Sequence, residues 1–166
     1  MAALLYATVG VTLAFSVVYY FRKLLHAHMC NRFSAYYNAR MEARKRRLFG
    51  GLDELAKAAA ASDRRRRLVI LDLGCGPGTN FEFYPAGSDV ICVDPNGYCE
   101  PLVYDNVGRC PDVRVSRFHV GGAENLRELV EADSVDAVVV TLVLCTVDDV
   151  VRSLQEIVRV LKPASI

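Results

Sequence analysis

The first 21 residues of this 166-residue chain contain no charged side chain, although the whole chain has 20 basic and 19 acidic residues. The net charge is close to zero, so it gives no general argument for binding nucleic acid. None of the six cysteines forms a C-x-x-C pair, which argues against a zinc site. We expect no metal, and reduced, packed thiols of a cytosol-facing protein.

The composition changes along the chain and predicts three regions. Residues 1–21 are expected to form a membrane anchor helix. Residues 22–66 should form a basic, mostly helical neck beside the membrane. Residues 67–166 should form the cofactor-binding part of a single α/β domain, which the chain length allows.

The predicted anchor runs from Ala2 to Phe21 and, as a helix, would be about 30 Å long, close to the thickness of a bilayer core. Tyr19 and Tyr20 stand where interfacial aromatics belong, and Arg22 and Lys23 follow, which should keep the remainder cytosolic. A cleaved signal peptide is the alternative, but it requires a basic start and a shorter apolar core. The sequence leaves open whether the anchor spans the bilayer or lies in one leaflet.

The neck carries apolar residues at helical spacing: Leu48, Leu52 and Leu55, with Phe49 beside them. This spacing predicts a helix that packs on the following domain. Contact of the basic residues with anionic lipid is the alternative. The arginine run 64–67 lacks the interleaved aromatics of a single-strand binder and is interpreted as solvated surface.

Short apolar runs alternate with helical patterns after residue 67. Strands are predicted at 68–73, 88–93 and 113–120, with a fourth inside 135–147. The third is the most polar, as expected of an edge strand. Helices are predicted at 101–107 and 148–161, with shorter ones at 79–84 and 124–130. This alternation indicates an α/β fold with a parallel sheet.

The last predicted helix places several apolar residues on one face before Pro163 ends it. These residues are Val151, Leu154, Ile157, Val158 and Leu161.

The loop Gly74-Cys75-Gly76-Pro77-Gly78 follows the first strand. A dinucleotide fingerprint, G-x-G-x-x-G, would need its third glycine at Thr79. A phosphate-binding Walker loop needs a lysine that this loop lacks. Neither phosphate pattern fits.

S-adenosylmethionine suits this loop better because it has no phosphate. Asp72 lies beside the loop and suits the ammonium of the amino acid end, while glycines let the backbone approach. Asp94 ends the next strand, about twenty residues further on, where an acid can accept the ribose hydroxyls. A glycine turn with incidental acids is the alternative.

These segments resemble class I methyltransferases, and more closely the membrane-anchored methyltransferase-like 7 proteins, which are alkyl thiol S-methyltransferases. The resemblance extends from about Tyr36 to Pro163. It rests on L-D-L-G-C-G-P-G-T, V-D-P-N, G-G-A-E-N, D-A-V-V-V-T-L-V-L-C-T-V and the more particular N-F-E-F-Y-P. It implies a Rossmann-like sheet of strand order 3-2-1-4, which is incomplete and preceded by an N-terminal membrane helix.

The resemblance also implies roles for individual residues in cofactor binding. The methionine end would be held by Asp72, Gly74, Cys75, Gly76 and Gly78. The ribose and adenine would be contacted by Asp94, Pro95, Asn96, Ala123 and Glu124. Thr141 and Leu142 would face the sulfonium and the methyl acceptor.

Simpler interpretations exist for several residues. Cys75 is expected to be a loop filler rather than a nucleophile, and Cys145 a core thiol rather than a group near the methyl. Glu124 could be a favourable first-turn acid of a helix. His26 and His28 lack acidic neighbours in the sequence and are not obvious ligands. No catalytic residue or general base can be assigned.

The implied activity is methylation of small lipophilic thiols at a membrane surface. No Asn-Pro-Pro-Tyr type cluster follows the fourth strand, which argues against nucleic-acid acceptors. The resemblance suggests the endoplasmic reticulum and lipid droplets as locations.

The family continues past Pro163, so the resemblance implies a C-terminally truncated chain. The apolar run Ala137 to Leu144 would then be a bare sheet edge. A partner protein, self-association, membrane lipid or the neck helix could cover it. The alternative function is therefore a catalytically weak or inactive form that keeps cofactor binding and membrane anchoring.

Overall fold

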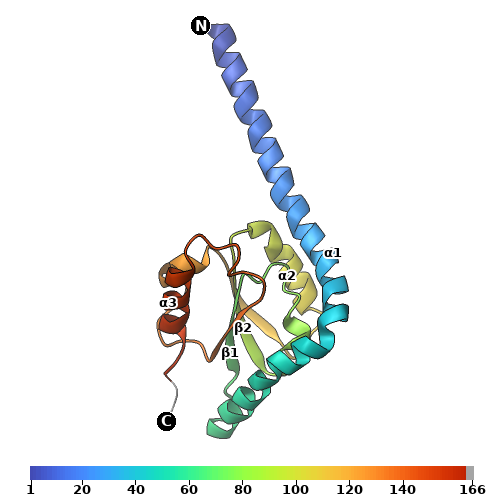
Figure 1. Cartoon of the computed structure of the whole chain (residues 1–166), viewed down its shortest axis with the longest axis vertical. Coiled ribbons are helices and arrows are strands. Elements are labelled where there is room, and N and C mark those ends of the chain that lie inside the picture. The colour runs from blue at the N-terminus through green and yellow to red at the C-terminus, as the bar shows by residue number, and fades with distance from the viewer. Residues whose placement is uncertain (164–166) are drawn as a thin grey trace.

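The protein is described by a computed structural model, which covers residues 1–163 except for the side chains of residues 2–5, 7 and 8. A long helix, α1 (Ala2–Ser62), leads into an α/β domain (Figure 1). The strands of the domain are β1 (Leu68–Leu73), β2 (Ser88–Asp94), β3 (Arg114–Val120) and β4 (Ala137–Val140). Its α-helices are α2 (Glu100–Val107) and α3 (Val150–Val160), and three short 3₁₀ turns, η1 (Phe81–Phe83), η2 (Gly97–Cys99) and η3 (Ala123–Glu128), complete it.

The four strands form one parallel sheet in the order β3-β2-β1-β4, which confirms the predicted order. Leu68 pairs with Ser88 and Ile70 pairs with Ala137, so the carboxyl ends of β1, β2 and β4 lie at the same edge. The glycine loop after β1 and Asp94 at the end of β2 therefore lie at the same end of the sheet, which is where α/β folds bind ligands.

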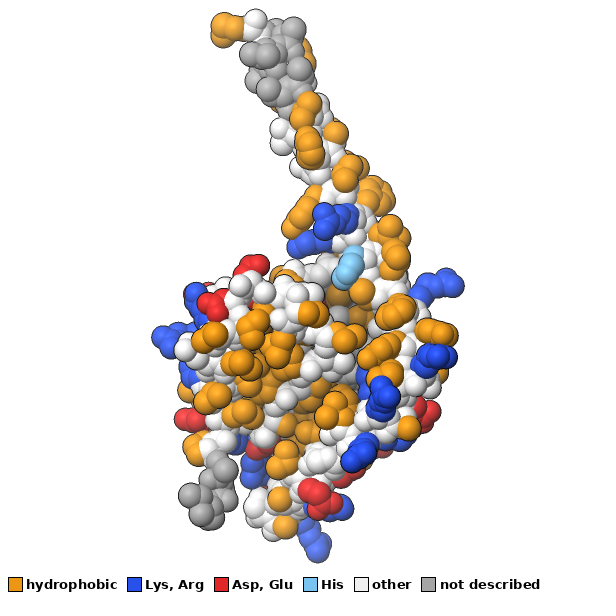
Figure 2. Space-filling model, viewed as in Figure 1, with side chains coloured by type: hydrophobic (Ala, Val, Ile, Leu, Met, Phe, Trp, Pro, Cys, Tyr) orange, Lys and Arg blue, Asp and Glu red, His pale blue; other side chains and the backbone are white. Residues whose placement is uncertain are grey.

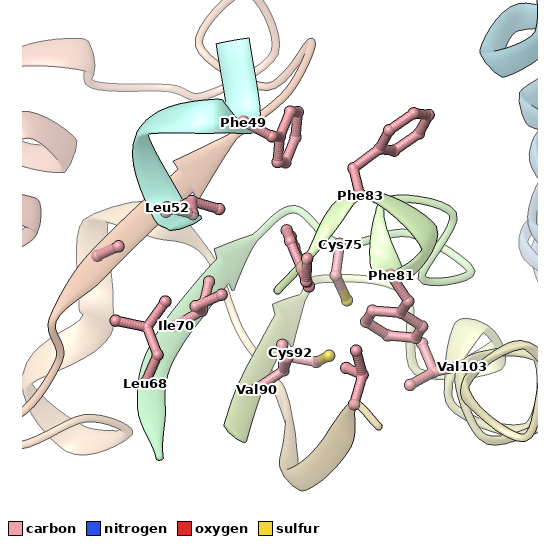
Figure 3. Packing of buried hydrophobic residues seen from close by; sticks show 13 residues of the cluster. Phe49, Leu52, Leu68, Ile70, Cys75, Phe81, Phe83, Val90, Cys92 and Val103 are labelled. Atoms are coloured by element: carbon pink, nitrogen blue, oxygen red, sulfur yellow. The ribbon is translucent and has the colours of Figure 1, made fainter. Parts of the chain in front are cut away.

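Each face of the sheet is covered by a separate hydrophobic core. Ile70, Val90 and Cys92 face a core that also contains Phe81 and, from α1, Phe49 (Figure 3). The alternate strand residues face the second core, which α3 and η3 cover. Figure 1 accordingly shows α1 and α3 on opposite sides of the strands. The alternation follows from the two-residue period of β-strands.

Helix α1 packs on the domain through only part of its predicted apolar stripe. Phe49 and Leu52 are buried, whereas Leu48 is 77% exposed and Leu55 is 42% exposed. The prediction that the neck packs on the domain is therefore confirmed for Phe49 and Leu52 and wrong for Leu48. Before about Tyr19, α1 projects beyond the domain as an isolated rod (Figure 1).

Of the two forms left open for the predicted anchor helix, the one that spans the bilayer is not supported by the structure. Within the described part of the chain, no helix combines the length and the apolar run that crossing a bilayer would require. Ala2 to Phe21 is nevertheless helical, as the first third of α1.

The fourth strand is shorter than its apolar sequence suggests. It ends at Val140, and Leu142 adopts a left-handed backbone with φ of 59°. A strand cannot continue through this conformation, so residues 141–149 form a loop. Hydropathy alone overestimated the strand because the loop itself is apolar.

Part of the predicted apolar face of α3 lies at the surface. Val151 and Val158 are 66% and 71% exposed, whereas Ile157 and Leu161 pack on the second core. In the described part of the chain, β4 has no strand partner on its outer side. Figure 2 shows hydrophobic side chains gathered between α3 and the lower half of α1.

Asp136 joins three segments at the bottom of the sheet. Its carboxylate accepts hydrogen bonds from Arg66 (2.5 Å), Lys162 (2.9 Å) and the backbone N–H of Val69 (2.9 Å). Burial raises the pKa of Asp136, but the bond from Lys162 and the other partners outweigh it, so the pKa lies below its ordinary value.

Replacing Asp136 with alanine should lower the free energy of unfolding by about 2 kcal/mol, because it leaves the Val69 N–H unsatisfied. Asp136→Asn keeps an acceptor for the Val69 N–H and should lower the free energy of unfolding by less. Because the pKa of Asp136 is depressed in the folded state, its ionised carboxylate stabilises the fold above pH about 4, and this contribution is lost on acidification. The difference in free energy of unfolding between the parent and Asp136→Ala should therefore narrow below that pH. Urea unfolding at several pH values measures this, and a gap that widens in acid would contradict it.

Candidate cofactor site

The glycine loop turns sharply at the carboxyl end of β1. Gly74, Gly76 and Gly78 all have positive φ, at 66°, 53° and 77°. Alternating left-handed residues are accessible to glycine with little strain, which explains the spacing of glycines at every second position. The turn is tied to β2, because the Gly74 N–H donates to the Val93 carbonyl at 2.7 Å.

Asp94 is held firmly at the end of β2 beside this loop. One carboxylate oxygen accepts the Gly76 N–H at 2.8 Å, and the other accepts the Asn96 N–H at 2.8 Å. Burial raises the pKa of Asp94, while these two backbone bonds oppose the rise. Each oxygen can accept a further bond, so a fixed carboxylate faces the adjoining cavity with spare acceptor capacity.

A cavity of about 570 Å³ opens between the glycine loop, the end of β2 and the loop after β4. This volume lies in the range of clefts that hold small molecules. Most of the predicted site residues line it. They are Gly74, Gly76, Asp94, Pro95, Asn96, Ala123, Glu124, Thr141 and Leu142.

Three predicted residues do not line this cavity. Gly78 faces a different groove of about 480 Å³, between α1 and α2. Cys75 packs in the first hydrophobic core beside Cys92 (Figure 3). Asp72 is fully buried, and its carboxylate accepts the Tyr84 hydroxyl at 2.7 Å. Asp72 does not line the cavity because its side chain points to the opposite face of the strand from Leu71 and Leu73, and its predicted role at the methionine end stays a prediction.

Asp72 has a raised pKa beneath the loop. Burial raises its pKa to about 6, against the opposing effects of the Tyr84 hydroxyl, the Asn80 side chain and the Lys45 ammonium. Its Oδ1 atom is buried and accepts no hydrogen bond from the described residues. A positive group arriving nearby would therefore stabilise the ionised form.

A buried lysine from α1 supports the same region. The Lys45 ammonium donates to the side-chain oxygens of Asn38 (2.6 Å) and Asn80 (2.8 Å). Burial lowers the pKa of Lys45, whereas Asp72 and Glu82 raise it. Asn80 in turn lies 3.4 Å from the Thr141 hydroxyl, so this network connects α1 to the cavity wall. Lys45 belongs to the basic neck, and no role at the cavity was predicted for it from the sequence.

Glu124 connects the two loops that close the cavity. Its carboxylate accepts the backbone N–H of Asp148 at 2.8 Å and that of Asp149 at 3.4 Å. Backbone hydrogen bonds, beginning with its own N–H, lower the pKa of Glu124. Glu124 therefore fixes the segment before α3. The sequence pattern did not reveal this contact, because the bonded residues are far apart in the chain.

The cysteines are not arranged as nucleophiles. All six are free thiols. The pKa of Cys75 is raised well above its ordinary value, first by its hydrogen bond with Cys92 and then by burial, so its reactive thiolate is disfavoured. Cys145 is exposed rather than in the core, which corrects the prediction for that thiol. Among the described residues, no cluster of His, Cys, Asp or Glu could hold a metal ion.

The cavity fits a nucleoside joined to an amino acid. The fixed Asp94 suits a ribose diol, and positive-φ glycines bring bare backbone to the cavity. Together with the parallel 3-2-1-4 sheet, these features define the nucleoside-binding half of a Rossmann-like methyltransferase.

Comparison with known proteins agrees with this class. The sequence model of the methyltransferase domain family matches residues 71–166. Among solved structures, YcgJ from Bacillus subtilis has a TM-score of 0.50 at 24% identity, covering 67% of this chain and 45% of that one. A Methanococcus maripaludis protein, named as a proposed S-adenosyl-L-methionine-dependent methyltransferase, has a TM-score of 0.51 at 16% identity, covering 80% and 59%. These two likenesses show the fold.

Curated relatives include two human proteins. Thiol S-methyltransferase TMT1A of Homo sapiens is 40% identical over 132 residues, which are 80% of this chain and 51% of the relative. Thiol S-methyltransferase TMT1B of Homo sapiens is 39% identical over 129 residues, which are 78% and 50%. The chain spans about half the length of the curated relatives it matches.

The chain belongs to the methyltransferase domain family. This membership confirms the resemblance to class I methyltransferases and the expectation of S-adenosylmethionine as the cofactor.

Proposed function

We propose that this chain binds S-adenosylmethionine in the 570 Å³ cavity and transfers its methyl group to a small lipophilic thiol. The observation that carries the proposal is the Asp94 carboxylate, which two backbone N–H groups fix at the mouth of the glycine loop. The thiol acceptor is supported by the roughly 40% identity to proteins named thiol S-methyltransferases.

The residues of the chain divide the work of binding. Asp94 would accept the ribose hydroxyls, and the backbone of Gly74 and Gly76 would lie along the amino acid end. Asp72 would balance the ammonium from beneath the loop through its charge. The cofactor supplies an electrophilic methyl group on a sulfonium. Thr141 and Leu142 line the remaining wall, where an acceptor would approach.

Alignment is the main contribution that this site can make to the reaction. Holding an acceptor in line with the methyl group converts a collision of two molecules into a step within one complex. Leu142 is 66% exposed and offers an apolar surface at the cavity wall, which suits a lipophilic acceptor. No described side chain is assigned as the base that forms the thiolate.

We place the protein at a membrane surface, with the endoplasmic reticulum or lipid droplets as the expected locations. The support is the rod of α1 beyond the domain, where Leu13, Phe15 and Val18 are all more than 60% exposed. Arg22 and Lys23 follow directly and could meet anionic headgroups.

A turnover assay tests the proposed reaction. The purified chain is incubated with methyl-labelled S-adenosylmethionine and a small alkyl thiol, and the labelled thioether is extracted and counted. Product above the level formed by Asp94→Ala supports the transferase. Binding of the cofactor without any product would reject catalysis by this chain.

The second candidate is a form that keeps cofactor and membrane binding but transfers methyl groups weakly or not at all. The observation that favours it is the outer side of β4, which lacks a strand partner among the described residues. The neighbouring exposed residues of α3 could instead bind a partner protein. The assay above separates the two candidates.

Cofactor affinity should depend on pH through Asp72. With a pKa of about 6, Asp72 is protonated below that pH and cannot balance an ammonium. Affinity for S-adenosylhomocysteine should therefore rise by about tenfold between pH 5 and pH 7. Calorimetric titration measures this rise, and Asp72→Asn should flatten it. An equally steep profile in Asp72→Asn would show that another group is responsible.

A further inference from the structure

One wall of the cofactor cavity comes from outside the region that the family model matches. His26 and Cys30 of α1 line the cavity together with Asp94 and Asn96. They stand one helical turn apart on the same face of α1, with the Cys30 sulfur 3.6 Å from His26 Nε2. The matched region begins only at residue 71, so these two residues lie outside it.

The position of this wall is fixed by direct contacts between α1 and the segment after β2. The Asn96 side-chain amide donates to the Lys23 carbonyl at 3.0 Å. The rings of Tyr20 and Tyr98 meet edge to face with centroids 5.0 Å apart. Ala27, between the two wall residues, is completely buried. This stretch of α1 is therefore seated on the domain.

The wall stands at the nucleoside end of the cavity. His26 also borders a smaller cavity of about 280 Å³ with Pro95 and Asn96, the residues that directly follow Asp94. Burial raises the pKa of Asp94, and His26 is one of the groups that oppose this rise, which places the imidazole within electrostatic reach of that carboxylate. His26 is thus next to the group that would accept the ribose hydroxyls.

We propose that His26 and Cys30 complete the nucleoside site, with the His26 imidazole hydrogen-bonding a ribose hydroxyl and the Cys30 side chain packing on the adenosine. This inference rests on the proposed function. An imidazole has a ring N–H that can donate to a hydroxyl oxygen in either protonation state. Helix α1 therefore contributes directly to cofactor recognition as well as carrying the apolar rod.

Binding measurements on the full chain test this assignment. His26→Ala should weaken both adenosine and S-adenosylhomocysteine by the same factor, about five- to tenfold, because both share the ribose. His26→Gln retains a donor and an acceptor and should recover part of the loss. Cys30→Ala should weaken both ligands by about twofold to threefold.

The matched control is His28→Ala. His28 is an exposed histidine of the same helix that does not line the cavity. Its replacement should leave both affinities unchanged, and all variants should retain the thermal midpoint of the parent. Equal affinities for His26→Ala and His28→Ala would overturn the inference while leaving the proposed function intact. Failure of the unaltered chain to bind S-adenosylhomocysteine would overturn both.

Discussion

Replacing Asp94 with alanine should reduce the affinity for S-adenosylhomocysteine by at least about 100-fold, the largest binding effect that we expect from one substitution. The carboxylate would lose its bonds to the ribose, and the Gly76 and Asn96 N–H groups would lose their acceptors. The loop and the end of β2 would then be less well fixed around the ligand. Isothermal titration measures the change.

Asp89 provides the matched control, because it lies in the same strand but at the opposite end. It forms a surface ion pair with Arg114 at 2.6 Å and does not line the cavity. Asp89→Ala should bind S-adenosylhomocysteine as the parent does, because Asp89 lies outside the cavity. Similar losses in the two variants would mean that the effect of Asp94→Ala comes from damage to β2 rather than from the ribose contact.

Replacing Gly78 with alanine should lower the free energy of unfolding by about 3 kcal/mol. The backbone there has a φ of 77°, and an added Cβ would lie 2.2 Å from Cε2 of the Phe81 ring. Phe81 is only 2% exposed and belongs to the first core, so the ring cannot move aside without disturbing the packing. Chemical denaturation measures the loss.

Gly76→Ala separates backbone strain from crowding. Gly76 also has a positive φ, of 53°, but an added Cβ would meet no atom within 4 Å. The expected loss of stability is therefore only about 1 kcal/mol. Gly76 lines the cavity whereas Gly78 does not, so this milder variant should nevertheless impair cofactor binding. Equal losses of stability in the two variants would contradict the packing argument.

Much of the sheet could be predicted because its strands have simple local signals. The run Leu68 to Leu73 is bounded by Arg67 and Gly74 and forms β1 with the predicted bounds. Asp94 could be placed beside the loop because parallel strands end at the same edge of the sheet. The length of β4 could not be predicted, because Leu142 leaves the extended conformation within a sequence run that remains apolar.

The misses at the site have a common physical cause, which is contact between distant residues. Nothing near His26 in the sequence suggests a ligand, and only the seating of α1 on Asn96 brings it to the cavity. Lys45 likewise acquires its role through Asn80, 35 residues away. The burial of Asp72 was predictable in principle, since strand alternation sends its side chain to the face opposite Leu73.

The most direct test of the account is a calorimetric titration of the unaltered chain with S-adenosylhomocysteine and, separately, with NADH. We predict saturable binding of one S-adenosylhomocysteine per chain, because Asp94 is positioned for its ribose. We predict no binding of NADH, because the glycine loop lacks the pattern that binds the phosphates of a dinucleotide. Binding of NADH in preference to S-adenosylhomocysteine, or of neither, would contradict the central claim.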